Sequence, residues 1–205
     1  MKLFGTPGSP FVRKVRIVLE EKRIPYEYVI ERGSAPGSRV PQHNPLGKIP
    51  TLVLDDGRSL YDSPVIVEYL DAVGAGARLI PDQLDERIEV RRWEALADGI
   101  VEATVAINHE YREPKDKQRP PAWFERHRAK IDRGLAVMAK DLGAGEFCFG
   151  ARFTLADIAA GYALGYLDFA LPDIDWRRTH PGLARLAERL APRPSFSATV
   201  QTKSA

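Results

Sequence analysis

The sequence contains a single cysteine, Cys148, among 205 residues. One cysteine cannot form an internal disulfide, and it cannot supply a multi-cysteine zinc site. This cysteine usage is typical of proteins in a reducing compartment, so we expect a cytoplasmic location. Because Cys148 stands between two phenylalanines, we interpret it as a small buried apolar side chain rather than a reactive thiol.

Long apolar segments are also missing. The longest uncharged stretch, 158–167, is about half of the ~20 residues that cross a bilayer. Near the N-terminus, Pro7, Gly8 and Pro10 interrupt the chain before an apolar segment of signal-peptide length develops. The sequence therefore indicates neither secretion nor membrane insertion, and we expect no membrane partner.

Neither sign of charge dominates. Lys and Arg together number 30 against 28 Asp and Glu, which gives a formal net charge of +2. Over 84–94, arginines alternate with glutamates as on a solvated helix, and no basic stripe forms, so no nucleic-acid partner is expected. The chain has no Gly-rich phosphate loop, and its histidines lack the spacing of metal ligands, so we expect neither a nucleotide nor a metal. These histidines are His43, His109, His127 and His180.

A chain of 205 residues is long enough to form two domains. Residues 1–76 show a mixed α/β pattern, with strands expected at 2–5, 26–30, 51–54 and 59–61 and helices at 10–24 and 63–73. Asp56-Gly57 predicts an antiparallel hairpin between the last two strands. The Gly-, Ser- and Pro-rich segment 32–42 is interpreted as a loop.

No convincing strand pattern follows the Gly- and Ala-rich linker at 74–81. We therefore expect an all-helical second domain over 84–205. The uncharged stretch 158–167 should be its buried centre. Helical patterns lie at 84–111, 122–142, 155–169 and 181–190.

Four short motifs occur along the chain. They are Ser9-Pro10-Phe11-Val12-Arg13-Lys14-Val15, Asn44-Pro45-Leu46-Gly47-Lys48-Ile49-Pro50, Asp62-Ser63, and Phe153-Thr154-Leu155-Ala156-Asp157-Ile158. The first resembles both the Cys-Pro-Tyr-Cys start of glutaredoxins and the corresponding Ser or Cys motif of cytosolic glutathione S-transferases. The others are similar, in order, to the Asn-Pro-x-Gly-Lys-Val-Pro loop, the Glu-Ser pair and the helical-domain capping box of those transferases.

The resemblance spans nearly the whole chain and favours a bacterial-type glutathione S-transferase with a Ser-Pro-Phe active-site motif. It implies an N-terminal thioredoxin-like domain of βαβαββα order, followed by a C-terminal helical bundle. It also implies glutathione as the cofactor, a small hydrophobic electrophile as the second substrate, and a homodimer.

Ser9 is the candidate catalytic residue. Backbone N–H groups and the macrodipole at a helix N-terminus favour negative charge, and a hydroxyl there could donate a hydrogen bond to a bound sulfur. Hydrogen bonding to the thiolate lowers the pKa of a thiol, so the nucleophile would be the sulfur of glutathione. Alternatively, Ser9 is only a helix cap. Val12 and Ser9 stand where other members of this fold carry cysteines, so disulfide exchange by the chain's own side chains is excluded at this position.

The resemblance assigns further residues to glutathione. Ile49-Pro50 should hold a cis bond that exposes the backbone of Ile49 to the cysteinyl segment, as though the ligand were an added strand. Lys48 would reach the glycine carboxylate, Ser63 the γ-glutamyl carboxylate and Asp62 the γ-glutamyl ammonium. Alternatively, Lys48 is a solvated loop lysine, and Asp62-Ser63-Pro64 is only a capping sequence. Phe11 and Val12, which are neighbours of Ser9, are also expected to bind glutathione.

The second-substrate pocket is expected to include Thr6, Ile107 and Tyr111. Tyr111 could be a proton donor or an aromatic wall, and packing in the helical domain is the alternative explanation for such residues. We interpret Thr154 and Asp157 as a structural capping box.

Two classes of function remain open at this point. The first is an enzyme that adds glutathione to an electrophile or uses it in a related isomerisation, dehalogenation or reduction. The second is a binding or regulatory protein of the same fold without transferase activity. A maleylacetoacetate isomerase is a further possibility, but the Ser-Ser-Cys-Ser-type opening of that group is absent.

Overall fold

The computed structural model describes residues 1–202, which pack as two units. The first contains Met1–Leu79 together with 192–202, and the second contains Ile80–Ala191. Each unit has its own buried apolar side chains, as expected for separate cores.

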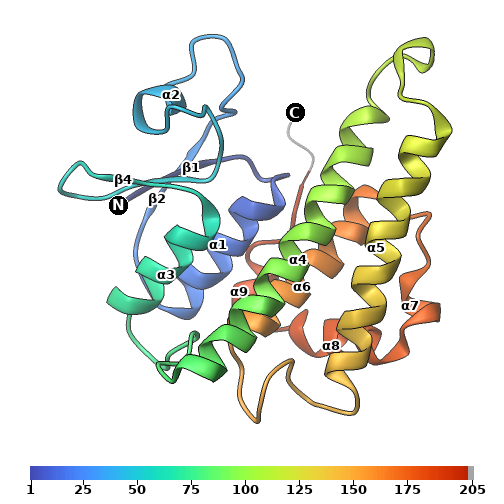
Figure 1. Cartoon of the computed structure of the whole chain (residues 1–205). Helices are drawn as coiled ribbons and strands as arrows, with labels where there is room; N and C mark the ends of the chain where they lie inside the picture. The colour runs from blue at the N-terminus through green and yellow to red at the C-terminus, as the bar shows by residue number, and fades with distance from the viewer. Residues whose placement is uncertain (203–205) are drawn as a thin grey trace. The chain divides into compact units, whose positions relative to one another are not determined.

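A four-stranded mixed sheet forms the first unit, in the spatial order β2-β1-β3-β4. β1 and β2 are parallel, and α1 connects them, whereas β3 runs antiparallel to both β1 and β4. Figure 1 shows α1 and α3 on one side of this sheet and α2 on the other. The expected small mixed α/β domain is therefore confirmed. Its elements are β1 (Lys2–Gly5), α1 (Pro10–Glu21), β2 (Glu27–Ile30), α2 (Val40–His43), β3 (Thr51–Val53), β4 (Ser59–Leu60) and α3 (Ser63–Val73).

Two local details differ from the residue pattern. α2 begins inside the segment interpreted as a loop, because a helix of four residues is too short to show a period. α3 begins at Ser63 with Asp62 as its N-cap, but no side-chain hydrogen bond caps this helix, although Asp62-Ser63-Pro64 reads as a capping sequence. Its first turn therefore keeps N–H groups that the helix itself cannot satisfy.

A buried ion pair connects the two long helices of the sheet unit. Lys22 Nζ lies 3.1 Å from Asp71 Oδ1, and both side chains are 1% exposed. The ammonium also donates to the carbonyl of Ala77 at 3.1 Å, and Asp71 Oδ1 accepts from the backbone N–H of Leu79 at 2.8 Å. One charged pair thus links the C-terminal end of α1, the last turn of α3 and the segment that follows α3.

The second unit is all-helical within the described residues, as predicted. α6 packs against α4, and α8 contacts α5, α6 and α7. Every residue of 158–167 except Gly165 is buried, which confirms this stretch as the centre of the unit. The short α7 and η1 were not predicted. The elements are α4 (Leu84–Glu110), η1 (Lys115–Lys117), α5 (Pro121–Leu142), α6 (Leu155–Ala170), α7 (Trp176–Thr179) and α8 (Pro181–Leu190).

The predicted capping box starts α6. The N–H of Thr154 donates to Asp157 Oδ2 at 2.8 Å, and the Thr154 hydroxyl accepts from the N–H of Ala156. Asp157 also accepts from the N–H of Cys148 at 2.8 Å, so this carboxylate fixes the preceding loop. Burial raises the pKa of Asp157, and hydrogen bonds from Cys148 and Thr154 oppose that rise. Burial also raises the pKa of the Cys148 thiol, which agrees with an unreactive, buried side chain.

The end of the chain differs from the prediction that the helical domain runs to 205. From Pro192 the chain packs with the sheet unit, where α9 (Pro194–Ser197) contacts α1. Arg193 Nη2 pairs with Glu21 Oε2 at 2.9 Å across 172 positions of sequence. No sequence pattern around either residue predicts this contact. Residues 203–205 lie outside the described part of the chain.

Two features are absent from residues 1–202. None of the helices in 1–202 combines the length and apolar character needed to cross a membrane. Within the same range, no three His, Cys, Asp or Glu side chains are grouped as a metal site would require.

Replacing Lys22 with methionine should reduce the free energy of unfolding by about 3 kcal/mol, because Asp71 would remain buried without its main partner. Urea denaturation measures this loss. Lys2→Met is the matched control, since Lys2 and Glu27 pair while more than half exposed, and it should cost less than about 1 kcal/mol. Equal effects of the two substitutions would contradict the importance of the buried pair.

Candidate functional site

In the helical unit, Tyr111 lies beside a recess of about 510 Å³ at the end of α4 and the start of α5. Its ring stacks on Phe124, with centroids 5.3 Å apart and planes 16° apart. The Tyr111 hydroxyl accepts from Arg128 Nη2 at 2.9 Å, and the same nitrogen lies 2.6 Å from Asp173 Oδ2. The recess therefore offers an aromatic wall whose polar end is fixed by an arginine.

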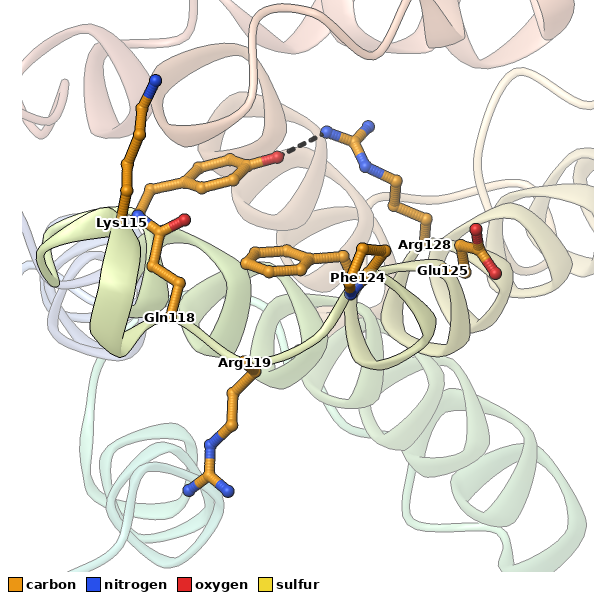
Figure 2. Close-up of a pocket in the computed structure, with 8 residues that line it drawn as sticks. Lys115, Gln118, Arg119, Phe124, Glu125 and Arg128 are labelled. Carbon is orange, nitrogen blue, oxygen red and sulfur yellow. Dashed lines mark hydrogen bonds between the residues drawn. The ribbon is translucent and has the colours of Figure 1, made fainter.

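The other cations of this recess do not converge. Figure 2 shows the side chains of Lys115 and Arg119 pointing away from Phe124 in different directions. The predicted neighbour of Tyr111, Ile107, is fully buried within α4, so its side chain contributes to the packing of the unit and does not line the recess. Of the predicted second-substrate residues in this unit, only Tyr111 reaches an open surface.

In the sheet unit, strand register brings the remaining motifs to one end of the sheet. Phe4 of β1 pairs with Thr51 of β3, and Leu60 of β4 pairs with Leu52. The C-terminal ends of β1 and β4 and the N-terminal end of β3 therefore lie together. The segments at these ends are 6–9, 48–50 and 61–63, which contain most of the predicted glutathione residues.

Ser9 is the N-cap of α1, and its Oγ accepts from the N–H of Val12 at 3.4 Å. Its own N–H donates to the carbonyl of Thr6 at 3.1 Å, which closes the turn before the helix. Among residues 1–202, nothing accepts the Ser9 hydroxyl proton. The cap and a donor to a ligand are therefore compatible roles for the same side chain.

The neighbours of Ser9 differ in exposure. Val12 is 1% exposed, and a Cβ built on Gly5 would stand 2.6 Å from its Cγ2. Glycine at position 5 therefore allows α1 to approach β1, and the Val12 side chain faces the interior. Phe11 and Thr6 are half-buried at the surface of the turn.

The loop over 44–50 is organised by one buried amide. Asn44 Nδ2 donates to the carbonyl of Lys48 at 2.9 Å, while Asn44 Oδ1 accepts from the N–H of Leu46 at 3.0 Å. The Ile49-Pro50 bond is cis, as expected. No described residue hydrogen-bonds to the backbone N–H or C=O of Ile49. A short stretch of unpaired backbone thus lies beside the first residue of β3, with the Lys48 side chain exposed next to it.

The start of α3 is a second unsatisfied polar position. Ser63 is 3% exposed, yet its hydroxyl has no partner among the described residues. Asp62 is exposed and follows a cis Tyr61-Asp62 bond. N–H groups at a helix N-terminus attract anions. This position is suited to a carboxylate.

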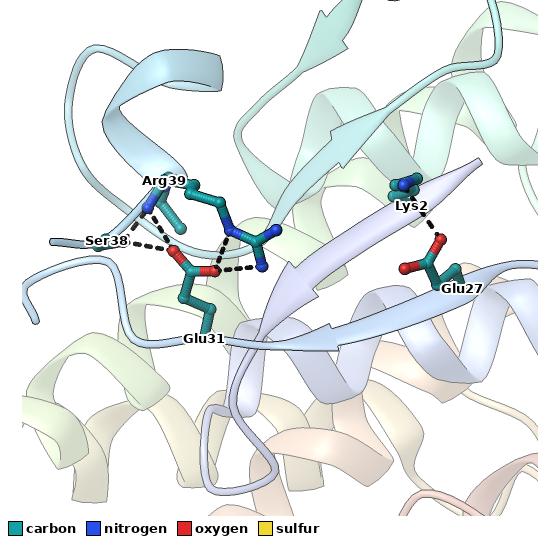
Figure 3. Close-up of polar contacts among 6 residues, drawn as sticks. Lys2, Glu27, Glu31, Ser38 and Arg39 are labelled. Carbon is teal, nitrogen blue, oxygen red and sulfur yellow. Dashed lines mark hydrogen bonds and ion pairs between the residues drawn. The ribbon is translucent and has the colours of Figure 1, made fainter.

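A carboxylate that the sequence analysis missed closes the neighbouring loop. Glu31 accepts from Ser38 Oγ at 3.0 Å, from Arg39 Nε at 3.0 Å and from the Arg39 backbone N–H, as Figure 3 shows. Hydrogen bonds from the backbone and side chain of Arg39 lower the pKa of Glu31, so the carboxylate is ionised at neutral pH. An acid and a base eight positions apart in a loop follow no helix or strand period, so no sequence signal marks this pair.

The loop closed by Glu31 contacts the 44–50 loop. A Cβ built on Gly33 would stand 2.1 Å from the carbonyl oxygen of Gly47, so the two backbones approach as closely as glycine permits. The Glu31 cluster therefore supports the segment that carries Lys48 and Ile49.

Comparison with protein families identifies both halves of the chain. Residues 8–73 match "Glutathione S-transferase, N-terminal domain", and residues 121–189 match "Glutathione S-transferase, C-terminal domain". The chain is also 38% identical to the uncharacterized GST-like protein YibF of Escherichia coli, over 99% of this chain and 100% of that protein.

Solved structures give the same result. A glutathione S-transferase from Methylobacterium radiotolerans, in complex with glutathione sulfonate, is 43% identical with a TM-score of 0.93, over 100% of this chain and 96% of that one. One from Methylobacillus flagellatus, with GSH bound, is 46% identical with a TM-score of 0.94, over 98% and 99% of the two chains. These similarities extend over both units.

Proposed function

Because this chain belongs to the glutathione S-transferase family, we propose that it binds glutathione at the sheet end and activates the thiol for attack on a small electrophile. The observation that carries the proposal is the set of unused polar groups there: the Ser9 hydroxyl proton, the backbone of Ile49 and the start of α3. The two similar transferases crystallised with glutathione or its sulfonate support this ligand.

Each part of the tripeptide has a complementary group in this proposal. The Ile49 backbone pairs with the cysteinyl segment in the manner of an added strand, and Lys48 meets the glycine carboxylate. Ser63, with the first N–H groups of α3, takes the γ-glutamyl carboxylate. Asp62 meets the γ-glutamyl ammonium, and Phe11 and Val12 complete the site beside Ser9, where the buried Val12 contributes through its backbone.

At Ser9, the hydroxyl donates to the sulfur while Oγ keeps its bond from the Val12 N–H. This donor, and the positive end of the α1 dipole, stabilise the thiolate relative to the thiol and lower the thiol pKa. The first turn of α1 has no acidic side chain to oppose this effect. The sulfur then forms a bond to the electrophilic carbon, and a leaving group departs with the electron pair, so glutathione is a substrate and not a cofactor.

We propose that the electrophile is contacted by Tyr111 of the helical unit and by Thr6 of the sheet unit. The stacked rings of Tyr111 and Phe124 favour an apolar or aromatic second substrate. A protein that binds glutathione without catalysis would show a raised melting temperature with glutathione but no turnover of an aryl halide, so the turnover assay distinguishes this alternative from the enzyme.

Glutathione should raise the melting temperature. A ligand that binds only the native state adds about 2.7 kcal/mol at a hundredfold excess over its dissociation constant, or roughly 5–10 °C for a chain of this size. Lys48→Met should reduce the shift, whereas Lys2→Met, a lysine at the far end of β1, should not. An unchanged melting curve at saturating glutathione would remove the central claim.

Replacing Ser9 with alanine should lower the conjugation rate by roughly ten- to a hundredfold, with a smaller effect on glutathione affinity. One hydrogen bond to a charged group is worth about 1.5–3 kcal/mol, and most binding energy comes from the ends of the tripeptide. The pH dependence of turnover with an aryl halide should show a raised thiol pKa. Thr179→Val removes an exposed hydroxyl of α7 in the helical unit and is the control. Unchanged rate and pKa in Ser9→Ala would leave Ser9 only as a helix cap.

We also propose that the chain forms a homodimer. Several large apolar side chains are about half or more exposed, and an interface with a second copy of the chain would bury them. They include Val65 and Val73 of α3 and Leu84 and Ile88 of α4. Light scattering should give twice the 22.9 kDa mass of the chain. A mass that stays at one chain across the concentration range would contradict the dimer.

A further inference from the structure

The C-terminal segment 193–202 lies along α1 in the sheet unit, as Figure 1 shows. Its contacts follow α1 from its last turn toward its first. Arg193 and Ser195 bind Glu21 in the last turn, and Arg16 Nη2 donates to the carbonyl of Ala198 at 3.2 Å. The segment therefore runs antiparallel to the helix that begins with the Ser9 turn.

Near the start of α1 this segment makes its most buried polar contact. Arg13 Nη1 donates to Gln201 Oε1 at 3.0 Å, and Arg13 Nη2 donates to the carbonyl of Phe196 at 3.5 Å. Arg13 is 9% exposed and Gln201 is 7% exposed, although they are 188 positions apart in sequence. Burial and the neighbouring Arg16 lower the pKa of Arg13 to about 10, so the guanidinium still carries its charge at neutral pH.

Removing one member of such a pair is costly for the other. A buried guanidinium that loses its acceptor must find another partner or move toward water. Arg13 Nε and Gln201 Nε2 already lack partners among the described residues. Few groups nearby are therefore available to replace a hydrogen bond that Arg13 loses.

The Arg13–Gln201 contact is connected to the Ser9 turn in two ways. The backbone N–H of Arg13 donates to the carbonyl of Ser9 at 3.1 Å, so a shift of Arg13 moves the first bond of the helix. The carbonyl oxygen of Thr202 lies 3.3 Å from the position of a Cβ built on Gly8, so the chain end covers the turn from outside. The segment is thus in contact with the turn both through a side chain and through its backbone.

We propose that Gln201 is a positioning residue, which holds Arg13 and with it the Ser9 turn in the geometry that the thiolate requires. Its effect on turnover rests on the proposed function, whereas its effect on the turn does not. In the absence of the Gln201 acceptor, the first turn of α1 opens more often, and the Ser9 hydroxyl spends less time directed at the sulfur.

The test compares three variants of the full chain. Gln201→Ala removes the acceptor, Gln201→Glu keeps an oxygen that can accept from Arg13, and Val200→Ala changes an exposed neighbouring side chain. Hydrogen exchange of the amides of Ser9, Val12 and Arg13 reports opening of the turn without any ligand. Steady-state kinetics with glutathione and an aryl halide report the KM for glutathione, kcat and the pH profile.

In Gln201→Ala we expect exchange of these amides to accelerate about tenfold, while amides of β1 and β3 keep their rates. The KM for glutathione should rise several-fold, and the thiol pKa in the pH profile should move upward. Gln201→Glu and Val200→Ala should behave like the unaltered chain. Faster exchange spread evenly over the sheet unit, or unchanged exchange of the turn, would overturn the proposal. If the unaltered chain binds no glutathione, the proposed function fails, and the exchange data alone decide whether Gln201 holds the turn.

Discussion

β3 lies between β1 and β4 and runs antiparallel to both, and this pairing decides which loops meet. With Phe4 opposite Thr51 and Leu60 opposite Leu52, the turn after β1, the loop before β3 and the loop after β4 share one end of the sheet. A slip of one residue would reverse the faces of the strand and separate these loops. The candidate glutathione site is therefore a consequence of strand register, and no single loop could form it.

The helices add a second constraint, because both α1 and α3 begin at this end of the sheet. Lys22 and Asp71 connect the two helices near their other ends and are shielded from water. A buried pair of this kind contributes little net stability compared with apolar packing, but it tolerates few alternative arrangements. It fixes the relation between two helix N-termini, one with the Ser9 hydroxyl and one with the unpartnered Ser63. These are the two positions where negative charge of the ligand is expected.

Buried polar groups recur wherever distant segments must be held in one arrangement. Asp157 joins the start of α6 to the loop at Cys148, Asn44 organises the loop before β3, and Arg13 joins Gln201 to α1. Each of these groups forms hydrogen bonds with named partners from distant segments or neighbouring loops. At the sheet end, the Ser63 hydroxyl and the backbone of Ile49 have no hydrogen-bond partner among the described residues. Both groups lie where the proposed ligand binds, and its carboxylate and peptide backbone would supply the missing hydrogen bonds.

Signals that act within a few residues determined much of this protein from its sequence. The Ser9 cap, the Thr154–Asp157 capping box and the Asp56-Gly57 hairpin each depend on neighbours at most four positions away. Helix periodicity placed the long helices to within a residue or two, except that α1 ends at Glu21, three residues before its expected end. The motifs around Ser9, Ile49 and Ser63 indicated the ligand class. These features could be predicted because local backbone chemistry produces them in any surrounding structure.

Tertiary structure decided the rest. α2 is too short for a period, and Ile107 lies on a helix whose pattern does not say which apolar side chains reach a surface. The Glu31–Arg39 contact and the placement of 193–202 against α1 depend on pairs eight and up to 188 positions apart. Such contacts form only after the sheet and the helices have brought the partners together. Their energy comes from burial and charge in the folded chain, so the sequence close to each residue contains no pattern that predicts them.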